Sequence, residues 1–307
     1  MGKLLAICIS EKKGTQKREV PSAILREEHG IVGDAHAGKW HRQVSLLSFE
    51  KIEDFRKRGA KIDFGAFGEN LVVEGYDLKS VPVGSCFRIG DCLLELSQIG
   101  KACHSHCEIY RQMGDCIMPR EGVFTEVLRG GEIRPGDSVE LIPADPDRPF
   151  SAAVITLSDR ASREEYEDLS GPLIQEMLEE AGFLVRERLL LPDGRQPLET
   201  ELKRLSDQRQ IELILTTGGT GFSERDLSPE ATKAVSEREV PGIGEALRAF
   251  SMKITAKAML SRQTAGIRKK SLIINLPGSP KACREELGFL LPLLPHGLGI
   301  LRGTESD

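Results

Sequence analysis

The chain has 307 residues, which is enough for two domains because a domain averages about 150 residues. Apolar residues make up 39% of the chain and charged residues 29%, a composition typical of globular proteins. The 42 basic and 47 acidic residues give a net charge of -5, and aromatic residues amount to 5%. Proteins that bind nucleic acid rely on a basic surface and on aromatic stacking, so we expect no nucleic-acid partner.

Two further features bear on location. The most apolar stretch, residues 287–301, is shorter than the roughly 20 residues of a membrane-spanning helix and contains two prolines. Seven cysteines are scattered along the chain, as in proteins whose thiols stay reduced. We therefore expect a cytoplasmic protein with no membrane partner.

In residues 1–143, short apolar runs closed by glycines predict strands joined by tight turns. The runs at 86–89 and 92–98 flank Gly90-Asp91, a pair that suits the turn of a β-hairpin. Further strands are expected at 4–10, 43–48, 70–75 and 138–142. One helix is expected near 49–59, with Ser48 as its N-cap. The pattern predicts a mainly antiparallel β-barrel.

A proline-rich linker, residues 144–150, separates the predicted barrel from residues 151–307, where apolar strands alternate with helices. Strands are expected at 151–158, 183–191, 211–217 and 271–278. Helices are expected at 170–182 with Ser170 as N-cap, at 197–207, from Ser228 and, as the last element, from Ser279. This alternation predicts a three-layer α/β domain with a mostly parallel sheet covered on both faces.

The segment 216–232 of this second half carries the clearest site motif. A strand ends in Gly218, Gly219 and Gly221, and a helix follows. Glycines let backbone N–H groups approach an anion, and the helix N-terminus favours negative charge. Asp226 would repel a bare phosphate, so its presence predicts Mg²⁺ between the two. The alternative is a tight turn with a solvated aspartate.

Three other strand ends carry polar residues of the same kinds. Asp159 and Asp193 each follow a predicted strand, and Gly278 with Ser279 joins a further strand to a helix. The carboxyl ends of parallel strands share one edge of a sheet, where ligands bind in open α/β folds. Each aspartate alone is as readily explained as a turn or cap residue.

The motifs ITLSDRAS, DLSG, LPD, TTGGTGFSERDLSPEAT and INLPGSPKA follow one another along residues 155–282. In this series the second half resembles the molybdopterin adenylyltransferase group. The resemblance implies that the domain transfers AMP from ATP to the terminal phosphate of molybdopterin, depends on Mg²⁺ and forms a trimer. It assigns catalysis to Asp193 and Asp226, with Mg²⁺ on Asp226. It assigns binding to Thr217, Gly218, Gly219, Thr220, Gly221, Ser223, Asp159, Pro277, Gly278 and Ser279.

The first half contains one misleading motif and one cysteine-rich segment. Residues 33–40 fit the spacing of a P-loop but end in Trp40, where Mg²⁺ binding needs Ser or Thr, so a P-loop is not expected. Cys103, His104, His106 and Cys107 lie too close together for the usual zinc spacing. Zinc, a buried structural cysteine and a thiolate activated by Lys101 remain the three alternatives.

The runs 30–50, 64–75, 87–103 and 122–141 resemble a MOSC domain, the family named for the C-terminal domain of molybdenum cofactor sulfurase. The resemblance places the functional cysteine at Cys103, as a molybdenum ligand or a sulfur carrier. It also makes His36, Arg42 and Asn70 candidates for binding a pterin phosphate, and Arg42 is the best of them by charge.

Both halves therefore point to one metabolite, molybdopterin or the molybdenum cofactor made from it. We expect a protein of molybdenum cofactor synthesis that works with molybdenum-insertion and other cofactor-synthesis proteins. The alternative is a non-catalytic protein that binds and delivers the cofactor; the acids Asp193 and Asp226 favour the enzyme, because a carrier has little use for groups that bind Mg²⁺.

Overall fold

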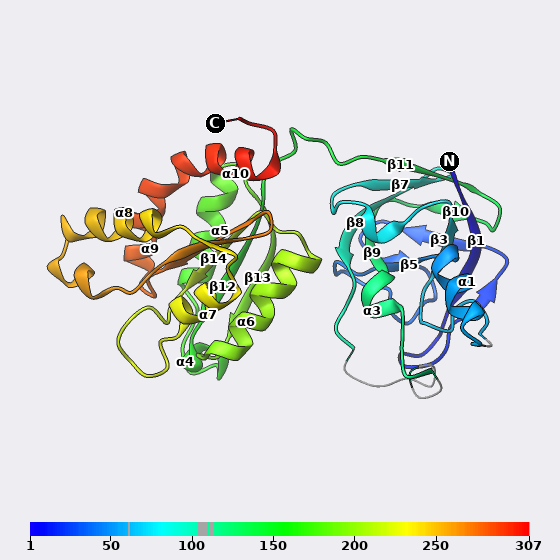
Figure 1. Cartoon of the computed structure of the whole chain (residues 1–307), viewed down its shortest axis with the longest axis horizontal. Helices are drawn as coiled ribbons and strands as arrows, with labels where there is room; N and C mark the ends of the chain where they lie inside the picture. The colour runs from blue at the N-terminus through cyan, green and yellow to red at the C-terminus, as the bar shows by residue number, and fades with distance from the viewer. Residues whose placement is uncertain (61, 104–109, 111–112, 307) are drawn as a thin grey trace. The chain divides into compact units, whose positions relative to one another are not determined.

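The computed structural model describes residues 1–60, 62–103, 110 and 113–306. The chain forms two compact units, Met1–Asp145 and Pro146–Asp307, each with its own sheets and its own hydrophobic core (Figure 1). The split between them falls within the segment 144–150 that the sequence marks as a linker.

The N-terminal unit is a closed barrel, as predicted. In pairing order its strands are β11 (Ser138–Ile142), β7 (Cys86–Ile89), β8 (Cys92–Ile99), β9 (Val123–Arg129), β5 (Val44–Ser48), β6 (Leu71–Glu74), β1 (Gly2–Ile9) and β2 (Arg18–Val20). A pairing of β11 with β1 closes the barrel. All neighbours are antiparallel except β5 and β6, which run parallel. The predicted hairpin is confirmed, because Ile89 pairs with Cys92 across the turn.

Smaller elements complete this unit. A second sheet pairs β10 (Gly131–Ile133), β3 (Ala23–Arg26) and β4 (Gly30–Ile31). The predicted helix is α1 (Phe49–Lys57), and a short helix α3 (Met118–Glu121) and a turn η1 (Leu78–Ser80) follow. Side chains that alternate along each strand point to opposite faces, so the barrel wall carries apolar residues on both sides. Leu4 points inward, whereas Ala6 and Cys8 pack outward against α1.

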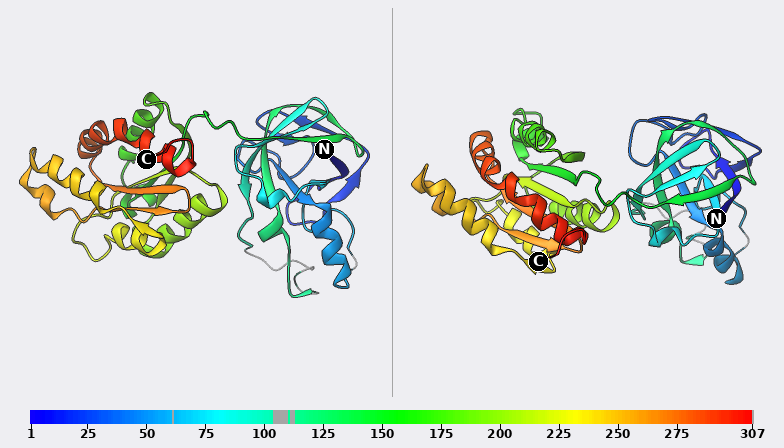
Figure 2. Two further views of the ribbon diagram at one scale, coloured as in Figure 1. Left: turned by 45° about the horizontal axis from the view of Figure 1, so that its top comes forward. Right: turned by 90° about the horizontal axis from the view of Figure 1, so that it is seen from above.

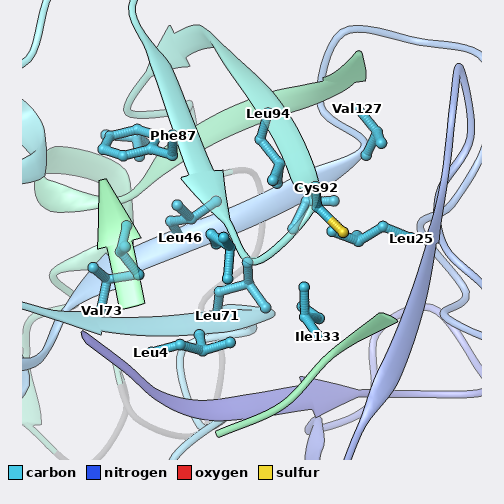
Figure 3. Close-up of a cluster of buried hydrophobic side chains, with 14 of the residues drawn as sticks. Leu4, Leu25, Leu46, Leu71, Val73, Phe87, Cys92, Leu94, Val127 and Ile133 are labelled. Atoms are coloured by element: carbon cyan, nitrogen blue, oxygen red, sulfur yellow. The ribbon is translucent and has the colours of Figure 1, made fainter. Parts of the chain in front are cut away.

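Figure 3 shows the interior of the barrel, where side chains from nearly every strand meet. Leu4, Leu46, Leu71, Phe87 and Leu94 are fully buried there. A side chain of this size contributes about 1.5–3 kcal/mol by leaving water, so this cluster is the main stabilising feature of the unit. These apolar side chains fill the barrel interior.

The C-terminal unit is built on one six-stranded sheet, and the predicted α/β class is confirmed. The strand order is β13 (Leu184–Leu191), β12 (Ser151–Leu157), β14 (Leu213–Thr217), β17 (Ser271–Leu276), β16 (Ala265–Arg268) and β15 (Arg238–Glu239). The first four strands are parallel, and the last two are antiparallel. The sheet is therefore mostly parallel, with an antiparallel edge that the sequence pattern did not reveal.

Helices cover both faces of this sheet (Figures 1 and 2). One face packs against α5 (Ser170–Glu180), α8 (Pro241–Met252), α9 (Pro280–Leu290) and α10 (Leu294–Arg302), and the other against α6 (Arg195–Lys203) and α7 (Ser228–Val235). Short turns are α4 (Asp159–Ser162), η2 (Arg204–Gln208), η3 (Ala256–Leu260) and η4 (Leu291–Leu293). Val154 faces the first layer and Ile155 the second, as strand alternation requires. Within the described residues no helix combines the length and the apolarity needed to cross a membrane.

The predicted helix caps are confirmed in position at Ser48 and Ser279, whereas those at Ser170 and Ser228 are wrong by one residue. Ser48 stands at the N-cap of α1 without bonding the helix, and Ser170 and Ser228 are the first residues of their helices, not the caps. Each hydroxyl instead donates to a backbone carbonyl of another segment; the acceptors are Tyr76, Gly278 and Gly218. Tertiary contacts therefore take the hydroxyls that a local pattern assigns to capping. Helices α8 and α10 are also absent from the sequence-based prediction, which ends with the helix after Ser279.

The segment that leads into β12 is bound to the end of the chain. The Arg302 guanidinium forms an ion pair with Glu212, where both side chains are about nine-tenths buried. It also lies 3.9 Å from the centre of the Phe150 ring. The same group donates hydrogen bonds to three backbone carbonyls before β12, those of Pro146, Arg148 and Pro149. Residues 146–150 thus pack as part of the C-terminal unit.

Candidate functional site

The carboxyl ends of β12, β13, β14 and β17 lie side by side, because the four strands are parallel neighbours. We call this the carboxyl edge. Asp159 follows β12, Asp193 follows β13, the glycine loop 218–221 follows β14, and Gly278 follows β17. The structure therefore brings together at one edge the residues that the sequence places at four separate strand ends.

The glycine loop turns sharply out of β14. Gly219 has a φ of +66°, and a Cβ at this position would lie 2.4 Å from the Ser228 hydroxyl oxygen, so only glycine fits. All four loop carbonyls accept hydrogen bonds from the protein. Ser228 donates to Gly218 O through Oγ and to Gly219 O through its N–H. Arg262 donates to Thr220 O through its N–H and to Gly221 O through Nε. By contrast, the N–H groups of residues 219–221 have no acceptor within the described part of the chain. The loop thus presents three successive backbone donors.

The second glycine turn packs directly against the first. A Cβ on Gly278 would lie 3.4 Å from the Gly218 Cα, and the Gly218 N–H donates to Leu276 O at 3.4 Å. Thr217 Oγ1 donates to Pro277 O at 2.6 Å, which fixes the end of β14 to the turn after β17. The two turns therefore form one rigid surface.

Cys283 supports this surface from below. Its fully buried Sγ donates to Pro277 O at 2.9 Å and lies 3.4 Å from Thr217 Oγ1. Burial raises the pKa of the Cys283 thiol to about 11, although the Thr217 hydrogen bond lowers it. The residue is therefore a neutral hydrogen-bond donor that joins both turns.

Asp226 lies at the end of the loop that follows the glycines. Its Oδ2 accepts the Ser223 N–H at 2.9 Å, whereas Oδ1 has no hydrogen bond to any described residue. A Cβ on Gly221 would come within 2.9 Å of Oδ2, so the glycine makes room for the carboxylate. Arg262 donates through Nε to Gly221 O at 2.7 Å and through Nη2 to Asp226 O. One carboxylate oxygen is thus held at a fixed place while the other is available.

Asp159 and Asp193 are joined by two hydrogen bonds, in each of which the backbone N–H of one residue donates to the carboxylate of the other. The Asp159 N–H donates to Asp193 Oδ2 at 3.0 Å, and the Asp193 N–H donates to Asp159 Oδ1 at 3.1 Å. Arg225 adds a two-pronged contact to Asp159, through Nη1 to Oδ2 and through Nη2 to Oδ1 at 2.8 Å. It also approaches Asp193 O at 3.4 Å. This contact ties loop 221–226 to the ends of β12 and β13.

The acids do not form a closed metal cage. In the ranges that the structure describes, no group of three or more His, Cys, Asp or Glu side chains is placed to hold a metal ion. Mg²⁺ in phosphate chemistry is commonly bound by one or two carboxylates together with substrate phosphates and water. A single carboxylate oxygen such as Asp226 Oδ1, beside a backbone anion cradle, fits that mode of binding.

The other residues predicted to bind ligand in this unit have distinct settings. Thr220 is buried, Ser223 is exposed, and Ser279 stands at the N-cap of α9 without a side-chain bond to it. Three residues that the sequence reasoning missed also shape the edge: Arg225, Arg262 and Cys283. Arg225 could have been predicted, because it directly precedes Asp226 in the sequence. Nothing in the sequence links Arg262 to a loop some forty residues earlier.

In the barrel, the Asn70 side chain joins strand segments to one another. Its Oδ1 accepts the Ser45 N–H and hydroxyl at 3.1 and 3.0 Å, and its Nδ2 donates to Cys8 O at 3.0 Å. The residue is 2% exposed. These contacts give Asn70 a place in the barrel wall, with no open face for a phosphate.

Arg42 and His36 lie in the loop between β4 and β5. The Arg42 guanidinium carbon is 4.7 Å from the centre of the Trp40 ring and 5.5 Å from that of Phe124. His36 Nδ1 lies 3.4 Å from Asp34 Oδ1. Both side chains remain partly exposed, so of the three predicted phosphate ligands these two have the accessible positions.

Asp34 of the same loop belongs to a buried charge cluster with Lys17 and Glu69. Lys17 Nζ binds Asp34 at 2.8 and 3.0 Å, and Asp34 also accepts the N–H groups of Ser10 and His36. Burial alone would raise the pKa of Asp34, but His36 and Lys17 outweigh it and hold that pKa well below its usual range. Burial lowers the pKa of Lys17, against the opposing effect of Asp34.

Glu69, the third member, is completely buried and accepts the N–H groups of Gly65 and Phe67. Burial raises the pKa of its carboxyl to about 7. The sequence reasoning overlooked this cluster, because its members are far apart in the chain and only the fold brings them together.

Cys103 lies just beyond β8 and is exposed, which disagrees with the alternative of a buried structural cysteine. The strand exit before it is fixed, since the N–H groups of Gly100 and Lys101 donate to Gly122 O and Pro119 O. His104, His106 and Cys107, which entered the zinc alternative, lie outside the described residues.

Comparison with known families assigns both units. A model described as a probable molybdopterin binding domain matches residues 153–296, and the MOSC domain model matches residues 33–140. These are the two families that the sequence motifs resemble.

Curated relatives agree with the assignment of the C-terminal unit. The molybdopterin adenylyltransferase of Helicobacter pylori (strain J99) is 47% identical over 153 residues, which cover 49% of this chain and 87% of that protein. That of Escherichia coli (strain K12) is 44% identical over 137 residues, or 44% of this chain and 70% of that protein. The structure of the molybdopterin biosynthesis enzyme MoaB from Thermus thermophilus covers 50% of this chain and 97% of its own, with 42% identity and a TM-score of 0.48. The chain therefore belongs, through its C-terminal unit, to the molybdopterin adenylyltransferase family, and its N-terminal unit is a MOSC domain.

Proposed function

We propose that the C-terminal unit transfers AMP from ATP to the terminal phosphate of molybdopterin and releases pyrophosphate. The observation that carries this proposal is the glycine loop beside Asp226, because its three N–H donors have no acceptor among the residues that the structure describes. Nucleotidyl transfer needs positioned substrates and charge neutralisation more than a covalent nucleophile. The carboxyl edge offers those features.

In this reaction the pterin phosphate attacks the α-phosphorus of ATP, and the bond to the β-phosphate oxygen breaks. The N–H groups of residues 219–221 would bind a phosphate, and the fixed Gly218–Gly278 contact would keep the two turns from moving apart. Asp193 would orient substrate beside Asp159. Mg²⁺, held by Asp226, would neutralise charge on the triphosphate. The related enzymes named above support this reading.

For the N-terminal unit we propose binding or sulfuration of the cofactor through Cys103. The exposed thiol and the match to the MOSC domain model support this role. The partly exposed Arg42 and His36 would bind the pterin phosphate. A cysteine sulfur is a soft ligand, so the exposed Cys103 suits either a molybdenum ligand or a carrier of sulfur.

We also propose that the protein acts in the cytoplasm as a homo-oligomer, a trimer formed by the C-terminal unit, together with molybdenum-insertion proteins. Apolar residues exposed at the end of α8 and along η3 support self-association; they are Met252, Ile254, Met259 and Leu260. Sedimentation equilibrium of the full chain tests this, and a monomer at micromolar concentration would contradict it.

The deciding experiment for the C-terminal unit is incubation of the full chain with molybdopterin, ATP and Mg²⁺, while pyrophosphate and adenylylated pterin are measured. We expect both products in equal amounts. Tight pterin binding without either product would contradict the enzyme and favour a protein that binds and delivers the cofactor. For the barrel, intact mass and metal content of the Cys103→Ser variant are compared with the parent chain. A persulfide or molybdenum present equally in both would exclude Cys103.

A further inference from the structure

Three arginines lie within two positions of the carboxyl-edge acids in the sequence, and in the described part of the chain Arg225 is the one that binds such an acid. Arg160 lies over the Tyr166 ring at 5.3 Å, and Arg195 pairs with Glu199 on its own helix. Arg225 instead grips both oxygens of Asp159. Its side chain is 56% exposed, whereas that of Asp159 is 16% exposed. The cation therefore lies on the solvent side of the pair, where an incoming anion would meet it first.

The loop that carries Arg225 is fixed at both ends independently of this pair. Arg262 binds the carbonyls of Gly221 and Asp226, and Asp226 closes the turn through the Ser223 N–H. Asp159 also keeps the Asp193 N–H as a donor when Arg225 is gone. Release of the guanidinium would leave Asp159 Oδ1 bound to the Asp193 N–H and Asp159 Oδ2 to be solvated by water, and would not displace Asp226.

The exchange of partners is energetically easy. An exposed ion pair stabilises a protein by only about 0–1 kcal/mol. A guanidinium binds phosphate with the same two-pronged geometry with which it binds a carboxylate. Because Arg225 directly precedes Asp226, a triphosphate bound at Asp226 would lie within reach of the arginine side chain.

We propose that Arg225 is a catalytic residue that leaves Asp159 to bind the β- and γ-phosphates of ATP, an inference that rests on the proposed AMP transfer. As the new bond between the pterin phosphate oxygen and the α-phosphorus forms, the bond from that phosphorus to the bridging oxygen breaks. The electron pair stays with pyrophosphate, and the N–H groups of Arg225 stabilise the charge that develops there. Asp159 serves as the resting partner of the arginine between turnovers.

The test removes either partner of the Arg225–Asp159 pair, which distinguishes a catalytic role of Arg225 from a purely structural contact between the loop and Asp159. Arg225→Ala, Arg225→Lys and Asp159→Asn are compared with the parent chain, and Arg195→Ala serves as the matched control. Turnover with ATP is measured together with binding of pyrophosphate in the presence of Mg²⁺ by calorimetry. Thermal unfolding of each variant confirms that it is folded.

We expect Arg225→Ala to lower kcat about 100-fold, as for other positioned groups that stabilise transition-state charge, and to weaken pyrophosphate binding at least 10-fold. Arg225→Lys should recover part of both losses, and Asp159→Asn should bind pyrophosphate as tightly as the parent or more tightly. Equal losses in Arg225→Ala and Asp159→Asn would overturn the proposal and leave a purely structural contact.

The two proposals fail in different ways. A parent chain that transfers no AMP but binds pyrophosphate through Arg225 would refute the enzyme and retain the phosphate contact. A parent chain that transfers AMP, with Arg225→Ala unchanged in kcat and in pyrophosphate binding, would refute the role of Arg225 alone.

Discussion

Charged side chains occupy two contrasting settings in this chain. In the barrel, Lys17 and Asp34 are 2% and 1% exposed and have each other as partners, and Glu69 beside them is completely buried. At the carboxyl edge, Asp226 keeps one oxygen available, and the partner of Asp159 is an exposed arginine. A buried pair cannot exchange partners without exposing an unpaired charge, whereas an exposed pair can. The first setting stabilises a fold, and the second suits the binding of a transient ligand.

The largest effect is expected from breaking the buried pair. Asp34→Asn would leave the Lys17 ammonium buried without a carboxylate, and the barrel should lose about 3–5 kcal/mol of stability. Trp40 is the only tryptophan of the chain, and its Nε1 donates to His36 O in the loop that contains Asp34. Its fluorescence during urea denaturation therefore measures this unit.

The control for that variant is the double change Lys17→Met with Asp34→Asn, which removes the charge as well. It should be clearly more stable than Asp34→Asn alone. If the single and double variants unfold at the same urea concentration, the cluster does not behave as a buried pair and the contrast between the two settings is lost.

The next effect concerns Asp226 and should appear in activity, not in stability. Asn at this position keeps an oxygen for the Ser223 N–H but loses the negative charge. We expect kcat for AMP transfer to fall about 100-fold or more, or about 3 kcal/mol, with thermal unfolding within a few degrees of the parent. Glu224→Gln, an exposed acid in the same loop, should leave kcat unchanged. A similar fall in both variants would show that Asp226 acts only through the net charge of the loop.

A third effect follows from the pKa of Glu69, which burial raises to about 7. Between its ordinary value and about 7, the folded barrel retains a proton that the unfolded chain has released, so stability falls as pH rises across that window. This difference in pKa between the folded and unfolded states corresponds to a loss of roughly 3 kcal/mol in the free energy of unfolding. Glu69→Gln should remove this pH dependence, while its amide nitrogen leaves one of the two N–H groups without an acceptor and lowers stability equally at every pH. Urea denaturation followed by Trp40 fluorescence at pH 5, 6, 7 and 8 compares the two pH profiles. Parallel pH profiles for the variant and the parent would contradict the assignment.

The smallest effect is expected at Cys283, which belongs to neither setting because it is buried and neutral. Cys283→Ala removes the donor to Pro277 O and should cost about 1–2 kcal/mol. Cys283→Ser keeps a donor and should cost less. If the turns act as one surface, the alanine variant also raises KM for ATP a few-fold with little change in kcat. An unchanged KM with lowered stability would limit Cys283 to a structural role.

Regular patterns in the sequence predicted the fold well, and contacts between distant segments limited the rest. The hairpin at Gly90-Asp91 and the parallel core of the second sheet follow from local alternation and turn chemistry, and both are confirmed. Ser48 holds its predicted N-cap position, but its hydroxyl and those of Ser170 and Ser228 do not cap their helices, because each donates to a carbonyl in another segment. Helix α8 was missed because its apolar face is short and two glycines interrupt its first turn.

The candidate site divides in the same way. The glycines and acids of the carboxyl edge were predictable because each lies at a strand end, and parallel strands share an edge. Their partners were not, because Arg262 and Cys283 come from elements that only tertiary packing brings beneath the glycine loop. The burial of Glu69 and Lys17 next to each other could not be predicted either, because only the fold brings these two residues together.

The contacts of Arg302 have a consequence for where the chain can be divided. The family models match residues 33–140 and 153–296, and neither range contains Phe150 or Arg302. A polypeptide started at Ser151 would lose the ring and the three carbonyls that surround the guanidinium, and one ended near residue 296 would leave Glu212 buried without that arginine. On the other side, the Ala144 N–H already donates to Ser85 Oγ in the barrel. The segment between the two family matches is thus part of the folded units on either side of it. To separate the two activities, the chain has to be cut after Asp145, and the C-terminal fragment has to keep helix α10.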